Sequence, residues 1–222
     1  MHTTRTLENI SDGKIYDVED MVAADAGGCN GCSACCHNVG DLVALTPFDA
    51  YELVNHLNIS FDSLLGDKLE LHEENKILLP HLKMQGATKR CSFLNAAGRC
   101  EIHSARPNIC RLFPLGRVYE KDDFKYFLQV GNCMKPKLEM VQVRQWIGIN
   151  NYEANKAMIL SWHQFIKALA FRLKFIRDAK ELEEINTYIL DNFYRITIEE
   201  NQDFYTAFTK QLVQAKSHLG II

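Results

Sequence analysis

Hydrophobic positions repeat with a helical period in the last third of the chain. In the segment 159–177, apolar residues recur every three or four positions and fall on one helical face: Trp162, Phe165, Ile166, Leu169, Leu173 and Ile176. The segments 179–193 and 198–219 are acidic near their starts, and the second carries lysines toward its end, as the helix dipole favours. The pattern predicts three antiparallel helices packed on the preceding part of the chain.

The earlier part of the chain has the pattern of short strands and one clear helix start. β-branched and aromatic residues flank polar turns in the segments 69–83 and 116–130, which predicts two β-hairpins. Thr46 precedes Pro47 and stands three positions before Asp49, so an N-terminal cap predicts a helix that begins at residue 47. Short strands followed by a helical bundle predict an α+β fold.

Composition excludes several classes of protein. The chain has 222 residues, 47% of them hydrophobic and 24% charged, so it can bury a core without the help of disulfides. Its net charge of −3 gives no basic footprint for nucleic acid, and we expect none as a partner. The first 20 residues contain no apolar signal-peptide core, and no apolar run approaches the ~18 residues of a membrane span. We therefore expect a cytoplasmic protein.

The cysteines are confined to one part of the chain. All eight lie between residues 29 and 133: Cys29, Cys32, Cys35, Cys36, Cys91, Cys100, Cys110 and Cys133. In a reducing compartment such thiols bind metal or act in catalysis, whereas a disulfide-stapled secreted domain is the alternative. Their distribution predicts a cysteine-rich metal-binding domain over residues 1–135 and a helical extension over residues 136–222.

The spacing of the first four cysteines favours metal binding. Cys29, Cys32 and Cys35 form C-x2-C-x2-C, which opens the bacterial iron–sulfur ligand run and also contains the short half of a zinc site. Cys36 departs from that run because it follows Cys35 directly. In extended backbone adjacent side chains point apart, so this pair would face two ions more easily than one. Eight thiols make two sets of four, but one centre with spare thiols stays open.

A basic segment surrounds the later cysteines. From Lys89 to Arg117 the chain has six cations and one acid, interleaved with three cysteines. Thiolates around a divalent ion carry a net negative charge, which nearby cations would offset. The alternative is a basic loop that faces solvent or binds an anion. His37 and His103 stand near the cysteines, and either could replace a thiol as a ligand.

Taken together, these features resemble the YkgJ-type cysteine-cluster family, whose CxxCxxCC domain is described as zinc- or iron-chelating. The resemblance rests on the cysteine run, on "LTP" with Asp49, on "CSFLNAAGRC" and on "RPNICRLFPLGR", and it covers roughly residues 14–135. It implies that the eight cysteines chelate iron, as an iron–sulfur cluster, or zinc. It also implies a link to flagellin lysine methylases, which carry a similar cysteine cluster.

Three hypotheses about function follow. The first is a protein that binds an iron–sulfur cluster or zinc in a structural or redox role. The second is an S-adenosylmethionine-dependent protein lysine methyltransferase, although the sequence has no G-x-G-x-x-G after a strand. The third is a zinc-stabilised interaction module whose helices meet a protein partner. No P-loop, zinc-protease helix or serine elbow is present, so no catalytic residue is assigned and enzymatic activity stays open.

Overall fold

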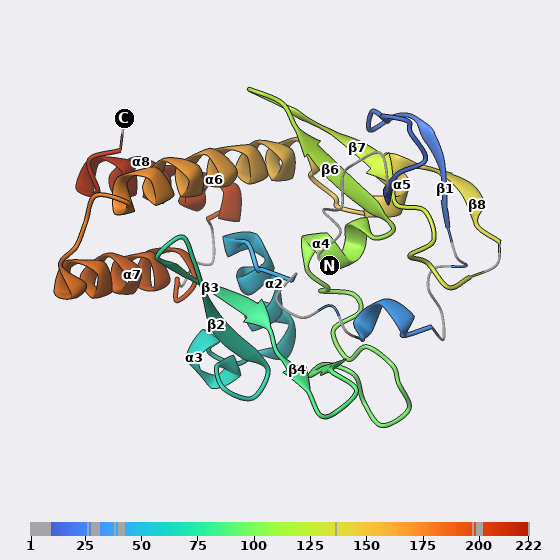
Figure 1. Ribbon diagram of the computed structural model, residues 1–222, viewed down its shortest axis with the longest axis horizontal. Coiled ribbons are helices and arrows are strands. Elements are labelled where there is room, and N and C mark those ends of the chain that lie inside the picture. The colour runs from blue at the N-terminus through green and yellow to red at the C-terminus, as the bar shows by residue number, and fades with distance from the viewer. Residues whose placement is uncertain are drawn as a thin grey trace, which may run out of the picture.

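The structure is a computed structural model that describes residues 10–25, 27, 32–37, 39, 43–135, 137–196, 198 and 202–221. Helices and short antiparallel strands account for much of this part of the chain, so the predicted α+β class is confirmed. Figure 1 shows the long helices gathered at one end of the molecule, with several of the short strands at the other. The helices are the 3-10 turn η1 (Ala34–Cys36), α2 (Pro47–Leu57), α3 (Phe61–Leu64), α4 (Asn108–Leu112), α5 (Val143–Ile147), α6 (Tyr152–Leu173), α7 (Ala179–Phe193) and α8 (Phe204–His218).

The strands pair in twos and form no large sheet among the described residues. Each pair is antiparallel: β1 with β8, β2 with β3, β4 with β5, and β6 with β7. Their bounds are β1 (Met21–Asp25), β2 (Leu69–Glu74), β3 (Ile77–Leu82), β4 (Met84–Gln85), β5 (Arg90–Cys91), β6 (Leu115–Tyr119), β7 (Phe124–Leu128) and β8 (Glu139–Gln142).

Both hairpins predicted from the sequence are confirmed. In the first, Leu69 of β2 pairs with Leu82 of β3, and the strands reverse at Asn75 and Lys76, whose φ angles are 52° and 67°. Two successive residues with positive φ give the tight turn that matches the twist of a hairpin, and asparagine tolerates this conformation well. The second hairpin is the β6–β7 pair, in which Leu115 faces Leu128.

The predicted helix start before residue 47 is also confirmed. The hydroxyl of Thr46 accepts a hydrogen bond from the Asp49 N–H, and the Asp49 carboxylate accepts one from the Thr46 N–H. Pro47 occupies the first turn, where its missing N–H costs nothing. These local contacts fix where α2 begins, and α2 ends at Leu57, followed by the C-cap Asn58 in the left-handed conformation.

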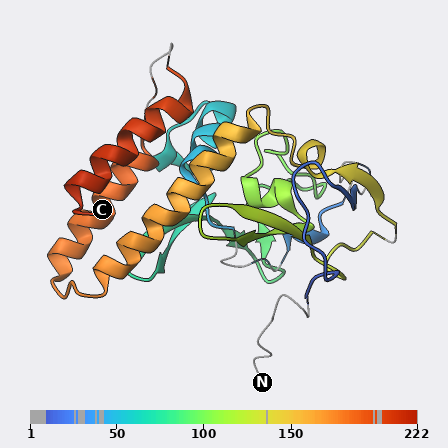
Figure 2. The same cartoon turned by 90° about the horizontal axis from the view of Figure 1, so that it is seen from above.

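The three C-terminal helices form as predicted, with two shifts at their ends. On the predicted apolar face, Ile166 is half-buried and the other members are buried. Ile176 belongs to the turn after α6 rather than to the helix, which ends at Leu173. The last helix begins later than its segment suggests, because the Asp203 side chain caps it by accepting from the Thr206 N–H. The chain reverses direction between α6 and α7, as Figure 2 shows.

The first hairpin fastens this helical part to the rest of the chain. Lys76 donates from its Nζ to the carbonyl oxygens of Leu173 at 3.0 Å and Ile176 at 2.7 Å, which satisfies carbonyls at the end of α6. The Asn186 side chain of α7 accepts from the Leu78 N–H at 2.7 Å. Buried side chains from both parts form one continuous hydrophobic core.

A strand from the segment after residue 135 also pairs with a strand of the cysteine-rich part. Strand β8 pairs with β1, so that Gln142 faces Met21 and Glu139 faces Asp25. A domain boundary at residues 135 and 136 stays a prediction.

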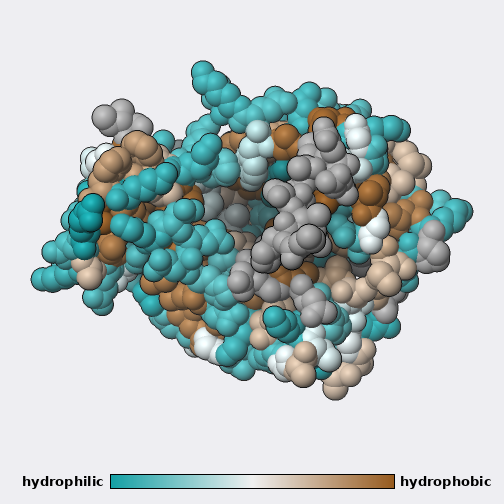
Figure 3. All heavy atoms as spheres, in the orientation of Figure 1, coloured by the Kyte–Doolittle hydropathy of each residue, from teal (hydrophilic) through white to brown (hydrophobic). Residues whose placement is uncertain are grey.

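On the face drawn in Figure 3, hydrophilic side chains cover most of the helical part. Among the described residues, none of the helices is long and apolar enough to cross a membrane.

Candidate metal centre

Cysteines far apart in the sequence meet at one cavity of about 360 Å³. Those that line it are Cys32, Cys35, Cys36, Cys91, Cys100 and Cys110. Cys29, also predicted as a ligand, lies outside the described residues. Cys133 is half-buried and is not part of the cavity wall, although its neighbour Asn132 is. The structure thus gathers thiols from the first cysteine run and from the later basic segment.

Short local structures position the cavity cysteines. Cys35 and Cys36 belong to η1, and the next residue, His37, forms a β-bridge with Arg90 at the start of β5. That bridge lies directly beside Cys91, the last residue of β5. Cys100 ends a tight loop closed by a bridge to Leu94, and Gly98 in this loop has a φ of 69°, which glycine adopts without strain.

Helix α4 carries Cys110 and is held at its start by a buried carboxylate. Asp49, only 3% exposed, accepts hydrogen bonds from the Asn108 N–H at 2.7 Å and from the Asn108 side-chain amide at 2.8 Å. Its other oxygen accepts from the N–H and hydroxyl of Thr46, each at 2.8 Å. Burial raises the pKa of Asp49 above its usual value, and these hydrogen bonds oppose that rise. One carboxylate therefore joins the starts of α2 and α4.

The other end of α4 is held by a tryptophan that the sequence reasoning did not single out. Trp146 of α5 donates from its indole N–H to the carbonyl oxygens of Leu112, at 3.3 Å, and Phe113, at 3.2 Å. These carbonyls lie at the end of the helix, where no intrahelical donor remains. Trp146 also lines the cavity, together with Gln129 near the end of β7. Only tertiary contacts reveal this polar and aromatic wall.

The thiols in the cavity perturb one another. The pKa of Cys35 falls to about 7, first because a hydrogen bond from Cys36 stabilises its thiolate and then because of the charges of Arg106 and His37. The pKa of Cys36 rises because it gives that hydrogen bond and because it is buried. Burial is the first cause of the raised pKa of Cys91, Cys100 and Cys110, and neighbouring thiolates add to it. The cavity therefore concentrates negative charge once these thiols ionise.

The adjacent cysteines do not face two different places. The expectation that they point apart assumed extended backbone, whereas residues 34–36 form a 3-10 turn. In this turn both side chains line the same cavity, and each thiol perturbs the pKa of the other. Both thiols can therefore reach one site, and the number of metal centres stays a prediction.

The cations of the basic segment separate into different roles. Arg106 lines the cavity. Arg90 instead donates to the carbonyl oxygens of Leu94 and Asn95 and closes the loop before Cys100. Arg111 donates to the carbonyl oxygen of Ser104. Both histidines weighed as alternative ligands, His37 and His103, do line the cavity.

The donor set fits a soft metal, although the ligands are not closed around a point. Among the described residues, no group of three or more His, Cys, Asp or Glu side chains forms a ready coordination set. The wall nevertheless offers six thiols and two imidazoles within one small volume. Thiolate and imidazole are the ligands that zinc, iron and iron–sulfur clusters prefer.

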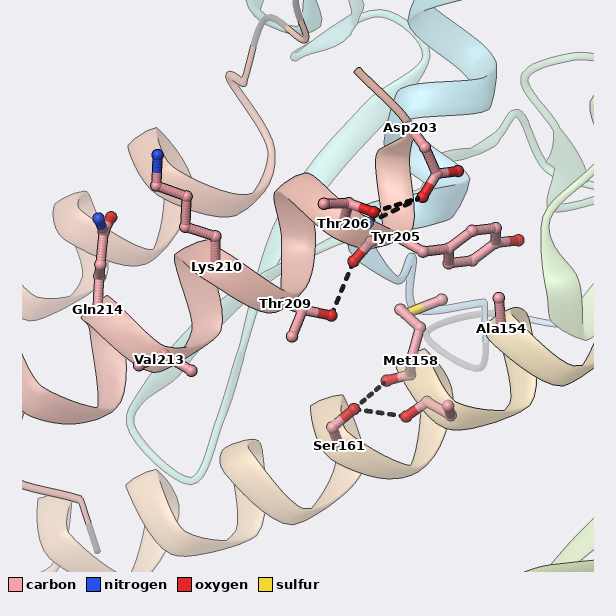
Figure 4. A pocket seen from close by; sticks show the side chains of 11 residues that line it. Ala154, Met158, Ser161, Asp203, Tyr205, Thr206, Thr209, Lys210, Val213 and Gln214 are labelled. Carbon is pink, nitrogen blue, oxygen red and sulfur yellow. Dashed lines mark hydrogen bonds between the residues drawn. The ribbon is translucent and has the colours of Figure 1, made fainter.

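A second cavity, of about 820 Å³, lies between α6 and α8. Figure 4 shows that several of its polar side chains make local hydrogen bonds: Asp203 caps α8, Thr209 donates to the Tyr205 carbonyl, and Ser161 donates to the Met158 carbonyl. Ala154 and Val213 contribute an apolar part of the wall. The chemistry of this groove is that of helix packing, so the cysteine cavity is the better candidate site.

Comparison with known families agrees with the motifs. Residues 28–133 match the family model of the CxxCxxCC domain, described as a putative zinc- or iron-chelating domain. The matched segment contains all eight cysteines. Comparisons with curated proteins and with solved structures gave no match.

Proposed function

We propose that this chain, whose residues 28–133 match the CxxCxxCC domain described as a putative zinc- or iron-chelating domain, binds its metal at the cysteine cavity in a structural or redox role. Metal binding in general is what the family description supports. The observation that carries the location is the meeting of six cysteines, from two distant segments, at one cavity of about 360 Å³. In a cytoplasmic setting these thiols would stay reduced and free to coordinate.

The proposed ligands come from the cavity wall. Cys35, Cys36, Cys91, Cys100 and Cys110 are close enough for the charge of one to raise the pKa of another. A bound cation removes that repulsion, because it stabilises several thiolates at once. Zinc would supply a structural cross-link between the two segments, whereas an iron–sulfur cluster would supply a one-electron redox couple.

Cys29 and Cys133 remain proposed ligands on the strength of the sequence alone. Each adjoins the proposed site in the chain, the first by C-x2-C spacing from Cys32 and the second by following Asn132 of the cavity wall. Cys133 therefore offers a direct test of whether a position in the wall decides metal binding.

The test is metal analysis of protein purified without oxygen. We expect stoichiometric metal in the wild-type chain. Visible absorption with acid-labile sulfide identifies an iron–sulfur cluster, and a colourless protein with zinc identifies the structural role or the zinc-stabilised interaction module. Protein that holds no metal and keeps the same stability when metal is offered contradicts the proposal.

Two matched variants locate the site. Cys110→Ser should lose most of the metal, because Cys110 lies within the cavity wall on α4. Cys133→Ser makes the same chemical change at a proposed ligand outside the wall and should lose a smaller share of the metal. Equal loss of metal in both variants would favour a ligand set that extends beyond the cavity. Equal retention of metal would show that it binds elsewhere in the chain.

A further inference from the structure

Arg106 stands apart from the other cations of the basic segment. Within the part of the chain that the structure describes, it is the single lysine or arginine in the wall of the cysteine cavity. Arg90 and Arg111 spend hydrogen bonds on backbone carbonyls outside that wall. The guanidinium of Arg117 lies over the Phe124 ring, 5.1 Å from its centre. The sequence alone did not distinguish which of these cations lies beside the thiols.

One donor of Arg106 is buried and has no acceptor. Its Nη1 donates to Nε2 of His103 at 2.7 Å, which makes this imidazole nitrogen an acceptor. Its Nε is buried and finds no hydrogen-bond partner among the described residues. A buried donor of a charged group rarely stays unpaired, because losing its hydrogen bond to water is unfavourable. Arg106, a residue of the cavity wall, therefore carries an N–H that lacks an acceptor.

The charge of Arg106 already acts on thiols from two segments. It favours the thiolate of Cys35, in η1, and that of Cys100, at the end of the small loop. Four thiolates around a divalent ion leave a formal charge of about −2, which needs compensation in a half-buried site. Arg106 thus combines a free donor and a positive charge at the place where negative charge would gather.

Building on the proposed function, we propose that Arg106 is a positioning residue of the metal centre, whose Nε–H donates to the sulfur of a metal-bound cysteine. The hydrogen bond withdraws electron density from that sulfur and holds it in place. The positive charge lowers the repulsion between the thiolates. His103, which accepts from Nη1, fixes the orientation of the guanidinium and is thereby a supporting contact rather than a ligand.

The test uses Co²⁺ as a spectroscopic probe, added to the full chain after its metal has been removed. The dissociation constant comes from competition with a chelator, and the sulfur-to-cobalt charge-transfer band reports how strongly sulfur donates electrons. We expect Arg106→Gln to weaken Co²⁺ binding by about 10–100-fold, as loss of an outer hydrogen bond to a metal ligand does, and to shift the band to lower energy. Arg117→Gln removes the same charge outside the wall and should leave both unchanged.

Arg106→Lys separates the hydrogen bond from the charge. Lysine keeps the charge but lacks the planar Nε donor, so binding should weaken by about tenfold and the band should still shift. If Arg106→Gln does not fold by circular dichroism, this variant decides the question, and an unchanged constant and band refute the proposal. Wild-type behaviour of a folded Arg106→Gln overturns the role of Arg106 and leaves the metal site standing. A wild-type chain without a cobalt–thiolate band overturns both.

Discussion

Replacing Asp49 with asparagine tests how the fold holds Cys110 at the cavity. The Asp49 carboxylate accepts four hydrogen bonds, two from Asn108 at the start of α4 and two from Thr46 at the start of α2. Asparagine has the same shape but only one acceptor oxygen. Its amide group would meet two donors, whichever way it turns.

The size of the effect follows from this mismatch. Each buried donor that loses its acceptor costs about 1–3 kcal/mol, so two such donors should lower the free energy of unfolding by about 2–6 kcal/mol. A domain of this kind has a total of only about 5–15 kcal/mol, and the loss is therefore large. Burial is essential to the argument, and Asp49 is 3% exposed.

Urea unfolding of the metal-free protein measures this loss. With a slope of about 2 kcal/mol per molar urea, the midpoint should fall by about 1–3 M while the slope stays the same. Asp178→Asn is the matched control, because the exposed Asp178 caps α7 through one oxygen that accepts from the Lys180 and Glu181 N–H groups. An asparagine oxygen can do the same, so we expect a change below about 0.5 kcal/mol.

One result would contradict this prediction. If Asp49→Asn is as stable as Asp178→Asn, the carboxylate does not join the two helices as argued. A second measurement follows the metal: the Asp49→Asn protein should release it to a chelator faster than the wild-type protein, because the start of α4 loosens while its thiol stays present.

Other outcomes are expected from the same structure. In metal-free protein, alkylation of Cys35 should reach half its maximal rate near pH 7, where its pKa lies. Cys110 should react more slowly, because burial raises its pKa. Mass spectrometry of labelled peptides measures the order of reaction, and the reverse order contradicts this prediction. Gly116→Ala should destabilise by about 1–3 kcal/mol, because a Cβ there would lie 2.3 Å from the Phe127 ring; an unchanged melting temperature argues against this close contact. S-adenosylmethionine should not raise the melting temperature of the full chain, and dose-dependent stabilisation would instead support the methyltransferase hypothesis.

The sequence determined the features that depend on neighbours along the chain. Short-range patterns predict three of these features: the capping box at Thr46, the β2–β3 and β6–β7 hairpins, and the apolar face of α6. The cysteine spacing likewise predicted the match of residues 28–133 to the CxxCxxCC domain model, because ligand types and their spacing are local properties of the chain. Helix ends were less exact, since the position of Asp203 as a cap depends on the backbone around it.

Only the tertiary structure determined which residues line the cavity. No spacing rule brings Cys35 beside Cys110, because residues 75 positions apart meet only when η1, β5 and α4 pack together. The same packing selects Arg106 from the cations of the basic segment and turns Asp49 from a helix cap into a link between two helices. Burial and long-range hydrogen bonds make these choices, and both arise from contacts between segments that local sequence patterns do not describe.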